Sequence, residues 1–201
     1  MNSPPIVVPQ WTGAGSLPTP ENGLLVFWLT TPFTQNRDLA RQLVRSALRE
    51  MLAPLLDCAP ATVPLLSQPG QPLRLAGRER QIGLSVSHAA GRSLVAIHLN
   101  GAVGVDLLRV DDLAMKDAEL QRMAMDYLGN EVARTLAGLP GEAQRQAFAN
   151  AWVGLEAGLK CLGDGLAEWS PERQALLAHC RIRGLLLPEG VVGAVAWLAT
   201  D

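Results

Sequence analysis

Several residues of the sequence have side chains that could bind a phosphate group. Ser87 and His88 end a predicted strand and enter a turn of small residues, where a hydroxyl and an imidazole could hydrogen-bond phosphate oxygens. Arg41, Arg45 and Arg49 share one face of a predicted helix, and guanidinium groups match phosphate oxygens in a bidentate way. The ordinary alternatives are a structural histidine at a strand end and a solvated helix face. The residues alone leave both interpretations open.

Two acidic residues far apart in the sequence could take part in the same chemistry. Asp106 ends the predicted strand 102–107, and a carboxylate in that position usually faces solvent or caps a turn. Glu156 lies on a predicted long helix four residues before Lys160, a spacing typical of a surface ion pair. The small residues near Glu156 would leave room for a ligand beside its carboxylate; they are Gly154, Ala157, Gly158 and Gly163. A surface role and a ligand-binding role therefore both remain possible.

The elements that would position these residues begin with a strand and an amphipathic helix. Residues 24–30 are rich in Val, Phe, Trp and Leu and predict a strand, and residues 38–52 have the apolar spacing of a helix. Three short apolar segments follow, at 82–87, 93–99 and 102–107. Asn100-Gly101 separates the last two, and this dipeptide favours a type I′ hairpin turn. We therefore expect the three segments to form an antiparallel meander.

The second half of the sequence predicts helices followed by a hairpin. Helices are expected over 114–127, 131–139 and 142–162, with Gly163 and Gly165 as stop signals for the last. Strands are expected over 180–187 and 191–199. Helices and hairpin-linked strands together predict an α+β class. Because each half offers a helix and an antiparallel sheet, we expect two similar lobes, residues 1–102 and 103–201.

Composition limits the classes of function. The 201 residues are 48% hydrophobic and 18% charged, which allows a buried core and argues against a disordered chain. The formal net charge of −2 gives no general affinity for nucleic acid. No segment has the pattern of a signal peptide or a membrane span, and the three scattered cysteines fit a reducing compartment. We therefore expect a cytoplasmic protein that binds neither membrane nor nucleic acid.

An ordered series of short motifs runs through residues 70–166, about half of the chain. The series consists of Gly70-Gln71-Pro72, Leu84-Ser85-Val86-Ser87-His88, Val103-Gly104-Val105-Asp106, the segment from Trp152 to Lys160, and Gly163-Asp164-Gly165-Leu166. In order and spacing it resembles the Sfp-type 4′-phosphopantetheinyl transferases, whose pattern runs GKP, SHS, GxDxE, WxxKEAxxK and GxGL. The helix that carries Arg45 is also similar to the N-terminal helix of that family.

The resemblance implies a pseudo-twofold α+β fold that holds coenzyme A and Mg²⁺ between its lobes, each with a helix on an antiparallel sheet. The implied enzyme transfers the 4′-phosphopantetheine arm of coenzyme A to a serine of an acyl or peptidyl carrier protein and releases 3′,5′-ADP. A pseudo-dimer within one chain would be compatible with a monomer. The implied setting is secondary metabolism, although the sequence does not identify the carrier protein.

Carried over position by position, the resemblance assigns a role to each candidate residue. It assigns Asp106 and Glu156 to the metal ion, Arg45, Ser87 and His88 to the nucleotide phosphates, and Lys160 to the pyrophosphate. Glu156 would also help to deprotonate the attacking serine, because a hydroxyl is a poor nucleophile until a base accepts its proton. Glu156 and Lys160 are therefore the expected catalytic residues.

Three positions depart from the family pattern. Leu108 stands where the second acid of DxE is usual, Leu155 replaces the lysine of KEA, and Gln71 replaces the lysine of GKP. Two carboxylates, substrate oxygens and water can still complete an octahedral shell around Mg²⁺. The missing lysines would weaken the grip on a polyphosphate. The alternative is therefore a weakened homologue that binds coenzyme A or a carrier protein without efficient transfer.

Overall fold

Two sheets lie back to back in the computed structural model, which describes residues 4–13, 17–33, 37–68, 71–77, 82–89 and 91–198. The first sheet has the strand order β2-β6-β5 and is antiparallel; its strands are β2 (Leu24–Thr30), β5 (Gly83–Ala89) and β6 (Arg92–His98). The second sheet has the order β1-β8-β9-β7; its strands are β1 (Ile6–Val7), β7 (Val103–Arg109), β8 (Cys180–Leu186) and β9 (Val191–Leu198). Its pairings are antiparallel except for the parallel pair β1 and β8. The expected α+β class is confirmed.

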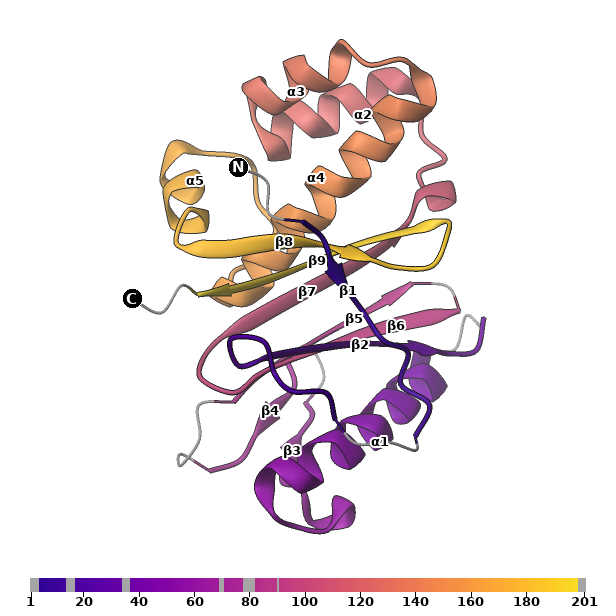
Figure 1. Ribbon diagram of the computed structural model, residues 1–201. Coiled ribbons are helices and arrows are strands. Elements are labelled where there is room, and N and C mark those ends of the chain that lie inside the picture. Colours follow the sequence, from indigo (N-terminus) through magenta and orange to yellow (C-terminus); the bar gives the residue numbers. More distant parts are fainter. Residues whose placement is uncertain are drawn as a thin grey trace.

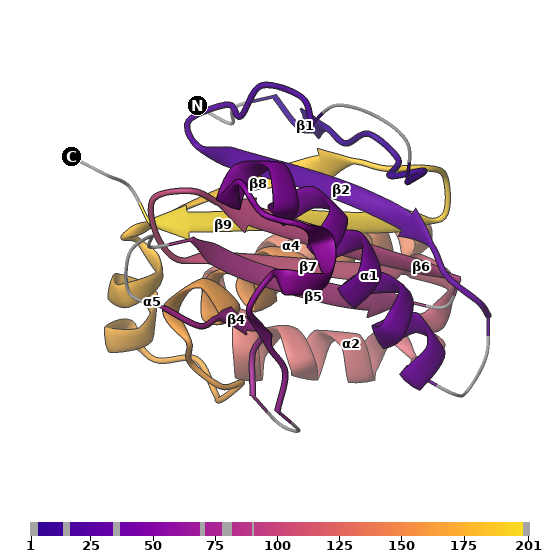
Figure 2. The same cartoon turned by 90° about the horizontal axis from the view of Figure 1, so that it is seen from below.

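Helices cover the outer face of each sheet (Figure 1). The helices are α1 (Arg37–Leu56), α2 (Asp117–Met123), α3 (Asn130–Ala137), α4 (Gly141–Leu162) and α5 (Pro171–Leu177), with short helical turns at Pro60–Thr62, Val110–Asp112 and Ala124–Leu128. The apolar face of α1 packs on the first sheet, where Leu48 and Met51 are fully buried. Figure 2 shows α1 from its outer side. A two-stranded hairpin, β3 (Leu65–Leu66) and β4 (Arg74–Leu75), extends the core beside α1.

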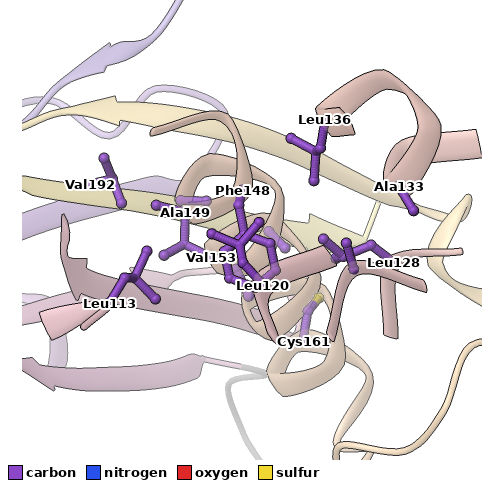
Figure 3. Close-up of a cluster of buried hydrophobic side chains, with 14 residues drawn as sticks. Leu113, Leu120, Leu128, Ala133, Leu136, Phe148, Ala149, Val153, Cys161 and Val192 are labelled. Carbon is purple, nitrogen blue, oxygen red and sulfur yellow. The ribbon is translucent and has the colours of Figure 1, made fainter. Parts of the chain in front are cut away.

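The second sheet is covered by α4, with α2 and α3 packed against it (Figure 3). Phe148 and Val153 of α4 are buried in this cluster together with Leu120 of α2. A third cluster lies between the two sheets and includes Leu94 of β6 and Val195 of β9. The order of layers is therefore helix, sheet, sheet, helix, and this arrangement places β5 and β7 at the boundary between the halves.

The predicted meander is wrong at its third strand. β5 and β6 do form a hairpin, but β7 pairs with β9 of the second sheet. The physical reason is that β6 is the central strand, with β2 and β5 on its two edges, and has no edge left for β7. Asn100 also lacks the positive φ that a type I′ turn needs at its first central position. The chain instead crosses from one sheet to the other at Gly101.

Backbone contact between β7 and α4 depends on Gly104. A Cβ at this position would lie 1.9 Å from the carbonyl oxygen of Ala157 and 2.4 Å from the amide nitrogen of Cys161. Only a glycine allows a strand and a helix to approach so closely. α4 ends at Leu162, before the stop signal that the sequence predicted at Gly163. Gly163 adopts a φ of 69°, and Asp164 N donates to Leu159 O. Gly104 and Gly163 thus fix the last turn of α4 against β7.

Smaller differences from the sequence predictions concern helix ends. The helix expected from residue 114 begins at Asp117, because the Glu119 side chain accepts a hydrogen bond from Lys116 N at the helix start. α5 was not predicted, although Ser170 followed by Pro171 is a recognisable helix start, and Ser170 Oγ accepts from Arg173 N. No helix among the described residues is both long and apolar enough to cross a membrane.

The buried thiol of Cys161 on α4 allows a test of the packing between α4 and β8. Burial, reinforced by the neighbouring Cys180, raises the pKa of Cys161 from 9.0 to about 12. Since the thiolate is the reactive form, we expect native Cys161 to resist iodoacetamide at pH 8 while Cys58, which is only half-buried, reacts. Peptide mapping by mass spectrometry would measure both. Equal labelling of the two thiols would contradict this packing.

Candidate functional site

Two serines of β5 join the two sheets along the boundary. β5 and β7 are edge strands of different sheets, and no backbone ladder is recorded between them across their described lengths. Instead, Val105 N donates to Ser85 Oγ over 3.0 Å, and Leu107 N donates to Ser87 Oγ over 3.2 Å. The hydroxyl groups thus satisfy the edge amides of β7 where a backbone carbonyl normally would. Asp106 lies between the two bonded residues.

Asp106 is in the middle of β7 and not at the strand end that the sequence predicted. The strand continues to Arg109 because its pairing with β9 extends to Val191. The side chain of Asp106 is almost fully buried, and its Oδ1 accepts hydrogen bonds from Ser87 Oγ at 2.8 Å and Lys160 Nζ at 2.6 Å. A buried carboxylate requires such partners, because an unpaired charge would be costly.

Lys160 and Glu156 approach Asp106 from the last turns of α4. Besides its ion pair with Asp106, the Lys160 ammonium donates to Val105 O over 3.2 Å. Burial, together with the negative charge of Asp106, raises the pKa of Glu156, while the charge of Lys160 lowers it. The two carboxyl groups are therefore close enough to repel each other. The structure brings together one strand acid, one helix acid and one helix lysine.

A groove of about 720 Å³ opens beside this cluster. Its charged and polar lining residues include Arg45 of α1, His88 of β5 and Lys160 of α4. Asp106, Glu156 and Ser87 are not part of its lining, but Lys160 links it to Asp106 directly. The remaining lining residues are Asp38, Arg41, Val44, Ser67, Gln68, Gln71, Pro72, Leu73, Leu84, Ser85, Val86, Gly163 and Asp164. The groove thus runs from the N-terminal half of α1 to the C-terminal end of α4.

Of the predicted phosphate-binding residues, some line the groove and others do not. Arg45 and His88 line the groove, whereas the buried hydroxyl of Ser87 is occupied by Asp106 and Leu107 N. Of the arginine stripe, Arg41 also lines the groove and pairs with Asp38, while Arg49 lies outside it. Gly70 of the first motif lies outside the described residues. The predicted contacts with a ligand stay predictions.

Two buried hydroxyl groups orient the imidazole of His88. Ser93 Oγ lies 2.7 Å from His88 Nδ1 and donates to Thr31 Oγ1 over 3.3 Å. The Ser93 hydroxyl can donate a hydrogen bond to Nδ1 or accept one from it, and either bond fixes the orientation of the ring. Sequence reasoning did not find this chain of hydroxyls, whose members are far apart in the sequence.

Replacement of Ser93 should therefore change both the stability of the protein and the position of the proton on the His88 imidazole. We expect Ser93→Ala to lower the free energy of unfolding by about 1–3 kcal/mol, because it leaves a buried polar group without its partner. We also expect the proton of His88 to redistribute between its two nitrogens, which ¹⁵N NMR shifts would report. Ser46→Ala on the exposed face of α1 is the control. Unchanged imidazole shifts in Ser93→Ala would contradict a hydrogen bond between Ser93 and His88.

The donor set of this site fits a hard divalent cation. Asp106 and Glu156 supply carboxylate oxygens, and Mg²⁺ commonly uses one or two carboxylates together with substrate oxygens. The Asp106 carboxylate already faces a cation, the ammonium group of Lys160. In the part of the chain that the structure describes, no group of three or more His, Cys, Asp or Glu side chains could hold a metal ion by itself. With Asp106 and Glu156 as its carboxylate ligands, substrate oxygens and water would complete the shell of such an ion.

The three departures from the motif pattern have different structural settings. Leu108 and Leu155 are half-buried and pack against the cluster between the second sheet and α4. Gln71 lines the groove, and its Oε1 accepts a hydrogen bond from Arg74 Nη2 over 2.7 Å. The two leucines thus contribute to the core, whereas Gln71 remains at the site. Sequence reasoning missed Arg74, although it lies only three residues from Gln71.

Ser85 belongs to the motif series, but the sequence predicted no role for it. Ser85 and Ser87 alternate with apolar residues, so they share one face of a strand. Alternation predicts a polar face but not the element that covers it. The structure shows that this element is β7, which lies in the other sheet.

Part of the chain is similar in sequence to known proteins. Residues 102–184 match the sequence model of the 4′-phosphopantetheinyl transferase superfamily. A Synechocystis sp. protein, slr0495, provisionally named a 4′-phosphopantetheinyl transferase, is 29% identical over 125 residues, which cover 62% of this chain and 49% of the relative. The 4′-phosphopantetheinyl transferase HetI of Nostoc sp. is 28% identical over 127 residues, which cover 62% and 52%. The chain therefore spans about half the length of the curated relatives it matches.

The matched region begins just before β7 and contains all three residues of the charged cluster, Asp106, Glu156 and Lys160. Two relatives bear the name of the same transferase, and the α+β architecture agrees with the fold that the motif series implied. Over residues 102–184 the chain is thus similar to the 4′-phosphopantetheinyl transferase superfamily, as the motif series implied.

Proposed function

We propose that this protein transfers the 4′-phosphopantetheine arm of coenzyme A to a serine of an acyl or peptidyl carrier protein in an Mg²⁺-dependent reaction. The observation that carries the proposal is the convergence of Asp106, Glu156 and Lys160 beside a groove lined by Arg45 and His88. Arg45 and Lys160 are 115 positions apart in the sequence, yet both line this groove. The groove and the charged cluster together offer groups for a polyphosphate and a divalent cation.

The proposed reaction is one displacement at phosphorus. The serine oxygen of the carrier protein forms a bond to the phosphorus atom that carries the pantetheine arm. The bond from that phosphorus to the bridging oxygen of the pyrophosphate breaks, and 3′,5′-ADP leaves with the bridging oxygen and the electron pair. The proton of the serine hydroxyl passes to a base, for which Glu156 is the candidate. Atoms and charge balance without a further reactant.

Different residues of the chain would bind the phosphates, hold the metal ion and position the carboxylates. Arg45 and His88 would hold phosphate oxygens in the groove, and Lys160 would place positive charge where negative charge accumulates on the leaving group. Ser87 would keep the Asp106 carboxylate in place through its hydrogen bond. Asp106 and Glu156 would hold Mg²⁺, which when bound neutralises charge on the pyrophosphate.

Mass spectrometry provides the direct test. An apo carrier protein incubated with coenzyme A, Mg²⁺ and this protein should gain the mass of phosphopantetheine on its serine. Omission of Mg²⁺ should abolish the gain. If several different apo carriers gain no mass although the protein binds coenzyme A, the proposed transfer is wrong.

A second candidate function is that of a weakened homologue that binds coenzyme A or a carrier protein without efficient transfer. It is favoured by the packing of Leu108 and Leu155, since both leucines serve the core where the motif pattern has charged residues. The same mass measurement separates the candidates when it is paired with a direct binding measurement. Binding without a mass gain favours the weakened homologue.

Further parts of the proposal concern the organisation and setting of the protein. The lobes 1–102 and 103–201 are supported by the start of β7 at Val103, although β1 from the N-terminal arm pairs with β8 of the second sheet. We propose a monomer in the cytoplasm that acts in secondary metabolism. Light scattering would test the monomer, because a mass of twice 21.5 kDa would contradict it.

A further inference from the structure

We propose that Arg74 binds a phosphate group of the ligand together with Arg45, next to the groove residues that lie beside the β3–β4 hairpin. Gln71 and Ser67 would act as positioning residues for the two guanidinium groups. The inference rests on the proposed function, because it names the part of this chain that would replace the missing lysine contact. Arg74 belongs to none of the motifs in the sequence.

The charges around the groove single out Arg45. The other charged side chains of the lining are neutralised in three ion pairs: Arg41 with Asp38 at 3.2 Å, Lys160 with Asp106 at 2.6 Å, and Asp164 with Arg173 at 3.3 Å. Among the described residues, no acidic side chain pairs with Arg45. Its Nη1 instead donates to the neutral hydroxyl of Ser67 over 3.5 Å. Arg45 therefore contributes an uncompensated positive charge to the groove.

Arg74 has the same kind of partner on the same wall. Its Nη2 donates to the amide oxygen of Gln71 over 2.7 Å, and no acid within the described ranges pairs with it. Arg74 is not itself a lining residue, but Gln71 is, so this bond holds the guanidinium group of Arg74 beside the groove. A neutral acceptor orients a guanidinium group without cancelling its charge, so the remaining N–H groups can bind an anion.

The hairpin fixes where these groups lie. Leu73 and Leu75 pack against the core of the first sheet, so Arg74 between them extends away from the core. Gln71 N donates to Gln68 O over 3.1 Å, which holds these two lining residues together. The wall that contains Ser67, Gln68 and Gln71 is thus anchored by apolar side chains. Arg45 and Arg74, which donate to Ser67 and Gln71 of this wall, pair with no acid among the described residues, which suits a phosphate group.

Calorimetric titration of the full chain with coenzyme A would test the role of Arg74. We expect Arg74→Ala to weaken binding about 10-fold or more, the loss typical of one charged hydrogen bond. The affinity of the variant should also depend less steeply on ionic strength, which a merely structural role would not produce. Arg145→Ala is the control, because Arg145 pairs with Asp117 away from the groove and should bind as the wild type does.

A rescue variant makes the test independent of folding defects. Gln71→Lys in the Arg74→Ala background places a cation at the groove without Arg74 and should restore most of the lost affinity. A parallel titration with 3′-dephospho-coenzyme A identifies the phosphate. If Arg74→Ala no longer weakens binding of that ligand, Arg74 contacts the 3′-phosphate; if the loss persists, it contacts the pyrophosphate.

The outcomes separate this inference from the proposed function. If the wild type binds coenzyme A and Arg74→Ala binds it equally well, the role of Arg74 is wrong, but the proposed transfer reaction is unaffected. Failure of the wild-type protein to bind coenzyme A would overturn both. Weaker binding in Arg74→Ala without rescue by Gln71→Lys, and with an unchanged dependence on salt, would reduce Arg74 to a structural residue of the hairpin and overturn the inference.

Discussion

Glu156→Gln should lower the rate of carrier-protein modification about 100- to 10,000-fold, the range that removal of a general base typically costs. The amide keeps the size of the carboxylate but cannot accept the serine proton and is a poorer ligand for Mg²⁺. Because Glu156 is only half-buried, the substitution should leave the fold unchanged. The rate of mass gain on an apo carrier protein, measured at saturating coenzyme A, is the readout.

The matched control is Glu142→Gln, at an exposed position in the first turn of the same helix. It makes the same chemical change on α4 far from Asp106 and should transfer at the native rate. Circular dichroism of both variants would show that the helix is intact. If Glu156→Gln also transfers at the native rate, Glu156 is neither the base nor an essential ligand.

Gly104→Ala should lower the free energy of unfolding far more than the same substitution at a glycine with open surroundings. The added Cβ would overlap the carbonyl oxygen of Ala157 at 1.9 Å and the amide nitrogen of Cys161 at 2.4 Å. Both are backbone atoms of α4, so the helix must move as a unit. Overpacking usually costs about 1–3 kcal/mol, and contact with backbone should place this variant at or above the upper end. Urea denaturation would measure the change.

Gly104→Ala should also impair the site, because the same helix carries Lys160 to Asp106 over 2.6 Å. Gly138→Ala is the control, since its added Cβ would meet its nearest neighbour, Thr135 O, at an ordinary 3.5 Å and its φ is −80°. This variant should be as stable as the wild type or slightly more stable. Equal stability of the two alanine variants would show that β7 and α4 are not in backbone contact.

Local sequence signals predicted most elements near the site. The strand at Leu24–Thr30 has the predicted bounds, and α4 ends at Leu162, before Gly163, as predicted. Such features depend on side-chain periodicity and on the conformational freedom of glycine, which are properties of a short segment. The pairing of β7 could not be predicted in this way, because Asn100-Gly101 favours a hairpin that the occupied edges of β6 do not allow.

The sequence by itself determined which chemical groups this protein has and which superfamily their order resembles. Asp106, Glu156 and Lys160 were identifiable from their motifs, and Gly104 and Gly163 were visible as glycines between apolar segments. What only the tertiary structure decided is how these groups meet. The contact between Lys160 and Asp106 spans 54 positions, and the bonds from β7 to Ser85 and Ser87 join two different sheets. Contacts of this kind arise from the packing of whole elements, which no short segment encodes.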